Sequence, residues 1–193
     1  MIDDRRRMFT ARYDSGDTPW DSGITPPEIM RILDELPPGD ALDLGCGTGT
    51  VMRDLLANGW RVDGIDFVPA AVETAAQKLA DFPPESWRSF CHDVTRLSEL
   101  PQLRERYNLI MDIGCGHGLH GAAAAEYARG LSNLLAKGGV FMLYAAQPRE
   151  ESTMGWTPEF VERLFCPPLQ LVWRRDGEDA KIGAKSSWYR MER

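Results

Sequence analysis

Residues 43–49 carry the first pattern in this chain that could do chemistry. They read Asp-Leu-Gly-Cys-Gly-Thr-Gly, a carboxylate followed by three alternate glycines, directly after the apolar pair Ala41-Leu42. Glycines let the backbone turn sharply and let a ligand approach without meeting a Cβ atom. A buried strand, a glycine turn and a following helix form the entrance to nucleotide sites in Rossmann-like sheets. The pattern therefore predicts a nucleotide-binding turn at this point.

Acidic residues indicate the charge of the expected ligand. Asp43, Asp66, Asp93 and Asp112 each stand at the end of a predicted strand. Because the carboxyl ends of parallel strands open on one crevice, these carboxylates should gather there. They oppose the anionic pyrophosphate of a dinucleotide, and Thr50 stands where the dinucleotide pattern has its third glycine. The crevice instead suits a cationic ligand with ribose hydroxyls, and S-adenosylmethionine has both features.

The run Leu42-Asp43-Leu44-Gly45-Cys46-Gly47-Thr48-Gly49 resembles motif I of the class I S-adenosylmethionine-dependent methyltransferases. This resemblance implies an α/β fold in one domain, residues 1–193: a Rossmann-like, seven-stranded, mostly parallel sheet flanked by helices, with strand order 3-2-1-4-5-7-6. It also implies S-adenosylmethionine as cofactor and S-adenosylhomocysteine as product. The implied cofactor-binding residues are Trp20, Asp43, Gly45, Cys46, Gly47, Thr48, Gly49, Asp66, Phe67, Asp93, Val94 and Asp112.

Two acidic positions have more specific expected roles. Asp66 follows the first glycine by roughly 20 residues, the offset at which an acid reaches ribose hydroxyls in this architecture. Asp93-Val94 is similar to the pair that contacts adenine in class I methyltransferases, where the carboxylate accepts from the exocyclic amine and the apolar neighbour packs on the ring. An alternative for Asp66 is a purely structural acid at a helix N-terminus.

The N-terminal residues 1–24 are polar and aromatic without clear periodicity, so they cannot form a core strand. Their Pro19-Trp20-Asp21 resembles a segment of the thiol, halide and thiopurine methyltransferase group that helps enclose the cofactor. We expect residues 1–24 to form a lid over residues 25–193, the α/β core. A frayed terminus with a surface tryptophan is the alternative.

A second stretch of chemical interest follows the apolar run 107–113. It reads Gly-Cys-Gly-His-Gly-Leu-His, and His117 is the best candidate for a general base because glycines leave space around it. A thiolate or halide acceptor needs no base, whereas a hydroxyl or a protonated amine does. Alternatively, His117 only hydrogen-bonds a loop carbonyl. The Cys, His and Asp residues near His117 match no zinc spacing, so we expect no metal.

The remaining elements follow from hydrophobic period and turn residues. Further strands are predicted at 60–66, 87–94, 107–113, 140–145, 169–174 and 184–191, with a charged turn at 176–179 and a loop at 147–155. One helix is predicted to begin at a capping box at Thr25, and another follows the glycine turn. Further helices are predicted at 69–79, 97–106 and 122–136, and a last one begins at 157. A helix C-cap is predicted at 137–139.

Composition limits the partners. The 193 residues carry a net charge of −7, which disfavours nucleic acid and anionic membranes, and no signal or membrane-spanning run is present. We expect a cytoplasmic monomer or homodimer acting on a small-molecule acceptor. The preferred acceptor is a thiol or halide, and a hydroxyl or amine using His117 is the runner-up. A nicotinamide oxidoreductase, a nucleic-acid methyltransferase and a non-catalytic cofactor-binding subunit are the rival functions.

Overall fold

The structure, a computed structural model, describes residues 2–149, 154–179 and 183–193. The chain divides into two compact units, residues 1–94 and 95–193, which are described separately below. Its seven strands form a sheet in the order β3-β2-β1-β4-β5-β7-β6, which confirms the predicted α/β Rossmann-like class and strand order. No helix in the described ranges has the length and apolar character needed to cross a bilayer.

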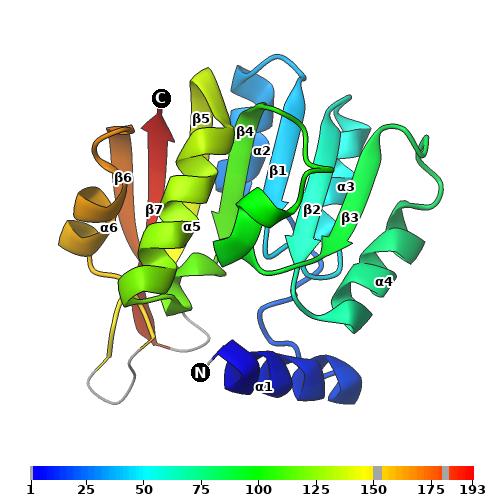
Figure 1. Cartoon of the computed structure of the whole chain (residues 1–193), viewed down its shortest axis with the longest axis horizontal. Coiled ribbons are helices and arrows are strands. Elements are labelled where there is room, and N and C mark those ends of the chain that lie inside the picture. The colour runs from blue at the N-terminus through cyan, green and yellow to red at the C-terminus, as the bar shows by residue number, and fades with distance from the viewer. Residues whose placement is uncertain (1, 150–153, 180–182) are drawn as a thin grey trace. The chain divides into compact units, whose positions relative to one another are not determined.

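Three parallel strands form the framework of the first unit (Figure 1). β1 (Asp40–Leu44) pairs with β2 (Arg61–Asp66), and β2 pairs with β3 (Trp87–Cys91). The apolar residues of β1 and β2 are fully buried, as expected for parallel strands covered on both faces. Three helices of this unit follow the strand-and-helix alternation: α2 (Pro27–Glu35), α3 (Thr50–Ala57) and α4 (Pro69–Leu79).

An additional helix, α1 (Ile2–Ser15), lies within residues 1–24, where the sequence shows no clear hydrophobic periodicity. In Figure 1 it lies beyond the arrowhead ends of β2 and β3. The prediction of α2 also needs correction, because α2 begins at Pro27 with Pro26 as its N-cap and uses no side-chain cap. The Thr25 side chain is buried and its hydroxyl bonds no helix amide, so the predicted capping box is wrong.

Gly64 on β2 leaves room for the segment that follows β1. A Cβ atom at Gly64 would lie 2.3 Å from Met52 Sδ and 3.0 Å from Cys46 Cβ. We predict that Gly64→Ala lowers the free energy of unfolding by about 1–3 kcal/mol, because an extra carbon in a packed core forces its neighbours to move. Urea denaturation measures this change. Gly177→Ala is the control, since its Cβ would meet only Ser186 Oγ, at 3.9 Å; equal stability losses for both variants would contradict the prediction.

The second unit combines one parallel and two antiparallel strand pairs. β4 (Tyr107–Ile113) runs parallel to β5 (Leu135–Ala146). β7 (Ala184–Glu192) is antiparallel to both β5 and β6 (Gln170–Asp179). The helical elements here are η1 (Val94–Glu99, which starts at the last residue of the first unit), the single turn η2 (Gly116–Gly118), α5 (Gly121–Leu134) and α6 (Pro158–Phe165).

Several predicted boundaries in this unit are wrong for identifiable reasons. The helix expected at 97–106 is only the short η1, because Pro101 cannot continue a helix. α5 ends before the predicted cap at 137–139, because Leu135 already pairs with Tyr107 in the sheet. The charged residues 176–179 continue β6 rather than forming a turn, because they pair with β7. The loop expected at 147–155 lies partly outside the described residues.

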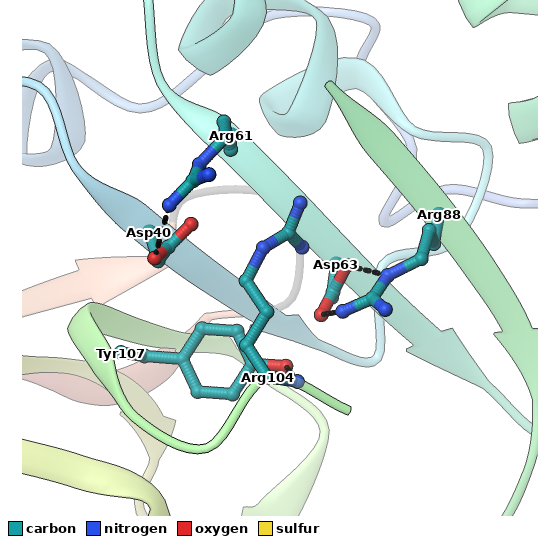
Figure 2. Close-up of polar contacts among 6 residues, drawn as sticks. All are labelled: Asp40, Arg61, Asp63, Arg88, Arg104 and Tyr107. Carbon is teal, nitrogen blue, oxygen red and sulfur yellow. Dashed lines mark hydrogen bonds and ion pairs between the residues drawn. The ribbon is translucent and has the colours of Figure 1, made fainter. Parts of the chain in front are cut away.

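Two ion pairs join the strands of the first unit away from the glycine-rich residues. Figure 2 shows the Arg88 guanidinium directed at Asp63, which is fully buried. Arg88 Nε donates to Asp63 Oδ1 at 2.8 Å and its Nη2 donates to Oδ2 at 2.5 Å. Arg61 on β2 donates to Asp40 on β1 at 2.8 Å. These pairs connect neighbouring strands. They give Asp40, Asp63 and the two arginines a structural role that requires no ligand.

Candidate functional site

The glycine turn, residues 45–49, connects β1 to α3. Gly45, Gly47 and Gly49 have φ angles of +78°, +52° and +77°, a left-handed conformation that favours glycine. The backbone N–H groups of Gly45 and Cys46 both donate to the Ile65 carbonyl, at 2.8 and 3.0 Å. The turn is therefore anchored on β2. Its left-handed backbone conformation explains why glycine stands at positions 45, 47 and 49.

Two acidic side chains flank this turn. Asp43 lies on β1, directly before Leu44, and is only 2 % exposed. Asp66 ends β2 and accepts from the backbone N–H of Gly47 at 3.1 Å and of Val68 at 2.9 Å. Burial raises the pKa of Asp66, and these backbone donors oppose that shift. Each carboxylate oxygen has two lone pairs, so Asp66 retains capacity to accept from a ligand's hydroxyl or ammonium groups.

Four aromatic rings pack together beside this turn, and Tyr13 lies over it; we call Phe9, Tyr13, Trp20 and Phe67 the aromatic cover. The ring centroid of Phe9 lies 5.1 Å from that of Trp20 and 5.8 Å from that of Phe67. The Trp20 indole N–H donates to the Tyr13 hydroxyl at 3.3 Å. A Cβ atom at Gly47 would lie 3.1 Å from that hydroxyl, so Tyr13 lies directly over the glycine turn. Trp20 is 43 % exposed, and the Arg12 guanidinium carbon lies 4.8 Å from the centroid of its ring.

A polar contact joins the Trp20 segment to the glycine turn. The Thr48 hydroxyl donates to Asp21 Oδ2 at 2.6 Å. Lys78 at the end of α4 donates from Nζ to the hydroxyls of Thr48 and Thr50, at 2.8 and 2.9 Å. Burial raises the pKa of Tyr13, and the nearby Asp66 and Asp21 charges add to that shift. Tyr13 is therefore a neutral hydroxyl near pH 7.

The end of β3 brings a further predicted residue to this region. The backbone N–H of His92 donates to the Asp66 carbonyl at 2.9 Å, so the segment carrying Asp93 and Val94 starts beside the end of β2. Val94 is buried. The structure therefore gathers most of the predicted cofactor residues within the first unit: Trp20, Asp43, Gly45, Cys46, Gly47, Thr48, Gly49, Asp66, Phe67, Asp93 and Val94.

Asp112 belongs to the second unit, where it holds the turn that follows β4. It is fully buried, and its carboxylate accepts from the N–H groups of Cys115 at 2.7 Å and Gly116 at 2.8 Å. The Tyr127 hydroxyl donates to Asp112 Oδ2 at 2.5 Å. Burial raises the pKa of Asp112 to about 6, although these donors stabilise its ionised form. The three donors explain a carboxylate at this position without a ligand.

His117 lies in η2 of the second unit, half-buried. Its Nδ1 atom accepts from the backbone N–H of Ala146 at 3.4 Å. A neutral imidazole that accepts at Nδ1 carries its proton on Nε2, so the outer nitrogen is a donor in this arrangement. The His117 carbonyl accepts from Gly155 N–H at 2.9 Å. These contacts favour a loop-holding role and do not favour a base at Nε2.

Three residues with clear structural roles were not predicted as site residues. Lys78 braces the glycine turn, and Tyr127 and Trp156 brace the turn after β4, where Trp156 Nε1 donates to the Leu119 carbonyl at 2.8 Å. Nothing in the local sequence around Lys78 or Trp156 signals these contacts. Tyr127 lies in α5, and its partner Asp112 lies 15 residues earlier in the chain. Among the described residues, no three His, Cys, Asp or Glu side chains gather as metal ligands would.

Comparison with known proteins places this site in context. The profile of the family described as "Methyltransferase domain" matches residues 42–141, which include the glycine turn, Asp66 and Asp112. A "Probable thiol methyltransferase 2" of Arabidopsis thaliana is 30% identical over 129 residues, 66% of this chain and 56% of that protein. A "Thiocyanate methyltransferase 1" of Brassica oleracea is 32% identical over 80 residues, 40% of this chain and 35% of that protein. The chain thus spans about half the length, or less, of these curated relatives.

Solved structures share the fold. A 1,6-didemethyltoxoflavin-N1-methyltransferase of Burkholderia thailandensis, solved with bound 1,6-didemethyltoxoflavin and S-adenosylhomocysteine, matches with a TM-score of 0.79 at 20% identity, over 96% of this chain and 85% of that one. The N-methyltransferase NodS of Bradyrhizobium japonicum matches with a TM-score of 0.72 at 19% identity, over 85% and 83% of the two chains. At these identities the likeness establishes the fold.

Proposed function

This chain belongs to the methyltransferase-domain family, and from that premise we propose that it transfers a methyl group from S-adenosylmethionine to a small-molecule thiol. The observation that carries the proposal is the glycine turn with Asp43 and Asp66 beside it and the aromatic cover above it. S-Adenosylmethionine combines positive charge, ribose hydroxyls and an aromatic base, and each has a matching partner type in this cluster.

The residue types present fit this cofactor. A Cβ atom at Gly47 would lie 3.1 Å from the Tyr13 hydroxyl, so this glycine allows α1 to approach the turn closely. Asp66, at the end of β2, would accept from the ribose hydroxyls, and Asp43 would attract the ammonium group. Asp93 and Val94 would take the adenine, and the exposed part of Trp20 would lie over the cofactor by cation–π attraction. Asp112 has a loop-holding role in this proposal because its own unit already provides its donors.

When bound, S-adenosylmethionine supplies an electrophilic methyl group with a neutral thioether as leaving group. The chain's own task is therefore to position the reactants and exclude water. Correct positioning of two reactants can lower a barrier by roughly 7–11 kcal/mol. The aromatic cover and the Asp21–Thr48 hydrogen bond would hold residues 1–24 closed over the glycine turn. This lid role would exclude water from the reacting atoms.

A thiol is the preferred acceptor for two reasons. The relatives named above include a thiol methyltransferase and a thiocyanate methyltransferase, and Pro19-Trp20-Asp21 resembles a segment of that group. In addition, His117 accepts a hydrogen bond at Nδ1, so its neutral tautomer carries the proton on Nε2 and His117 is not poised there as a base. A thiolate needs no base, whereas a hydroxyl or a protonated amine does.

His117→Gln tests whether the reaction needs a base. We expect the variant to methylate a thiol with a kcat within about threefold of the wild-type value, because general-base catalysis, typically worth roughly 100-fold or more, is not used. The pH profile of kcat is the second readout, and it should keep its shape. A fall in kcat of roughly 100-fold with unchanged cofactor affinity would instead assign His117 as the base.

The proposal as a whole is tested with a panel of thiols, halides, phenols and amines. The purified chain is incubated with S-adenosylmethionine, and S-adenosylhomocysteine and the methylated acceptor are quantified by mass spectrometry. We expect both products in equal amounts, with the highest kcat/KM for a thiol. Methylation of only phenols or amines would overturn the thiol assignment. Cofactor binding without turnover on any acceptor would favour a cofactor-binding subunit.

A further inference from the structure

A cavity of about 420 Å³ lies along one side of α1, and its described lining residues are Arg6, Arg7, Thr10, Ala11 and Asp14. This volume lies within the roughly 300–1,000 Å³ typical of small-molecule sites. The five residues recur three or four positions apart, so they form a single stripe on the helix. We call this stripe the cavity face of α1. Two guanidinium groups stand at one end of this stripe and Asp14 at the other, and four of its five residues are exposed.

The cavity face adjoins the aromatic cover. Phe9 and Tyr13 are one helical turn apart on α1 and form the stripe that packs beside Trp20 and Phe67. Arg6 precedes Phe9 by three residues and Thr10 by four, so it lies on the border of the two stripes. Its Nη2 atom lies 4.0 Å from Cys91 Sγ, at the end of β3. The cavity face therefore adjoins both the aromatic cover and the end of β3.

The charges of the cavity face favour an anion. Within the described residues, the Arg7 guanidinium has no hydrogen-bond or ion-pair partner, and Arg6 has only the long contact with the Cys91 sulfur. Asp14 lies seven residues beyond Arg7, roughly 10 Å along the helix axis at 1.5 Å per residue. The arginine end of the cavity is therefore cationic, and a planar guanidinium matches a carboxylate by two parallel hydrogen bonds.

We propose that this cavity is the acceptor site and that Arg6 and Arg7 select a thiol that also carries a carboxylate. The proposal rests on the proposed methyl transfer. The anion that the arginines bind is separate from the reacting sulfur, because two cations on a thiolate would stabilise it and slow its attack. In the reaction the thiol loses its proton to solvent and its sulfur bonds the methyl carbon. The methyl–sulfonium bond breaks, and its electron pair stays on the sulfur of S-adenosylhomocysteine.

Two matched acceptors test this selectivity: 3-mercaptopropionate and its neutral amide, 3-mercaptopropionamide. We expect wild-type kcat/KM to favour the carboxylate by roughly tenfold or more, the range for hydrogen bonds to a charged group. In the double variant Arg6→Gln/Arg7→Gln this ratio should fall to near one, with the loss appearing in KM. The ratio of the wild type should also fall as salt is raised. Arg31→Gln, an equal charge change at an exposed position of α2, should keep the wild-type ratio.

Ala11→Leu tests the cavity without changing charge. Its larger side chain would occupy the space between the arginines and Asp14, so KM should rise for both thiols while affinity for S-adenosylhomocysteine stays at the wild-type value. A wild-type ratio near one, or a ratio that survives in the double arginine variant, would overturn the proposal.

Failure of the proposed function would give a different result. If neither thiol is methylated, calorimetric binding of 3-mercaptopropionate and its amide to the chain saturated with S-adenosylhomocysteine decides the cavity proposal alone. Preference for the carboxylate that is lost in Arg6→Gln/Arg7→Gln would support an anion site in a protein with another acceptor. Equal binding of both compounds, or no binding of either, would show that the cavity is not an anion-binding site.

Discussion

Asp66→Ala is expected to weaken binding of S-adenosylhomocysteine by roughly 100-fold or more. A hydrogen bond to a charged group contributes roughly 1.5–3 kcal/mol, and the two ribose hydroxyls would both depend on this carboxylate. The same substitution also removes the acceptor of Gly47 N–H and Val68 N–H, so the glycine turn would lose its tie to the end of β2. Isothermal titration calorimetry measures the change.

Two variants make the Asp66 result interpretable. Asp81→Ala removes an equal charge from an exposed position that follows α4 and should leave affinity unchanged. Asp66→Asn keeps an oxygen that can accept from Val68 N–H, so it should bind with intermediate affinity. Circular dichroism checks that each variant is folded. A dissociation constant for Asp66→Ala within threefold of the wild-type value would contradict the proposal that the cofactor's ribose binds at the end of β2.

Asp112→Asn is expected to change how stability depends on pH. Burial raises the pKa of Asp112 from 3.8 to about 6, so the unfolded chain ionises first as pH rises. The folded state therefore loses stability between about pH 4 and 6, and a shift of about two units corresponds to about 3 kcal/mol. This stabilising contribution of the protonated acid is complete below the unfolded pKa and absent above the folded one.

Urea denaturation at pH 4.5 and 7.5 measures that difference. From the lower to the higher pH, the wild type should lose stability relative to Asp112→Asn, which cannot ionise. The comparison between two chains cancels the titration of other carboxylates that both share. Parallel pH profiles for the two chains would contradict the prediction, and would mean that the donors from Cys115, Gly116 and Tyr127 fully offset the burial of the charge.

The sequence predicted best where one local rule determined the structure. Apolar residues and alternate glycines identified β1 and its turn, and the continuous apolar run 107–113 coincides with β4. The left-handed backbone at Gly45, Gly47 and Gly49 favours glycine, which is why the glycine spacing predicted the turn correctly. The strand order came from the family resemblance and not from the residues alone, since no local signal specifies which strands are neighbours.

The sequence failed where distant contacts decide the structure. α1 has no clear amphipathic period, and it is held by ring contacts such as that between Phe9 and Phe67, residues far apart in the chain. The Asp112–Tyr127 hydrogen bond could not be predicted for the same reason. His117 shows a different limit, because the choice between a base and a loop-holding residue depends on the backbone N–H of Ala146.

The preference of the purified chain between two nucleotide ligands tests the central claim most directly. That claim is that the acidic residues and the glycine turn of the first unit bind a cationic nucleoside. Calorimetric titration of the wild-type chain with S-adenosylmethionine should show one site per chain and low-micromolar affinity, and titration with NAD should show no binding. Tight binding of NAD together with no heat from S-adenosylmethionine would contradict the account.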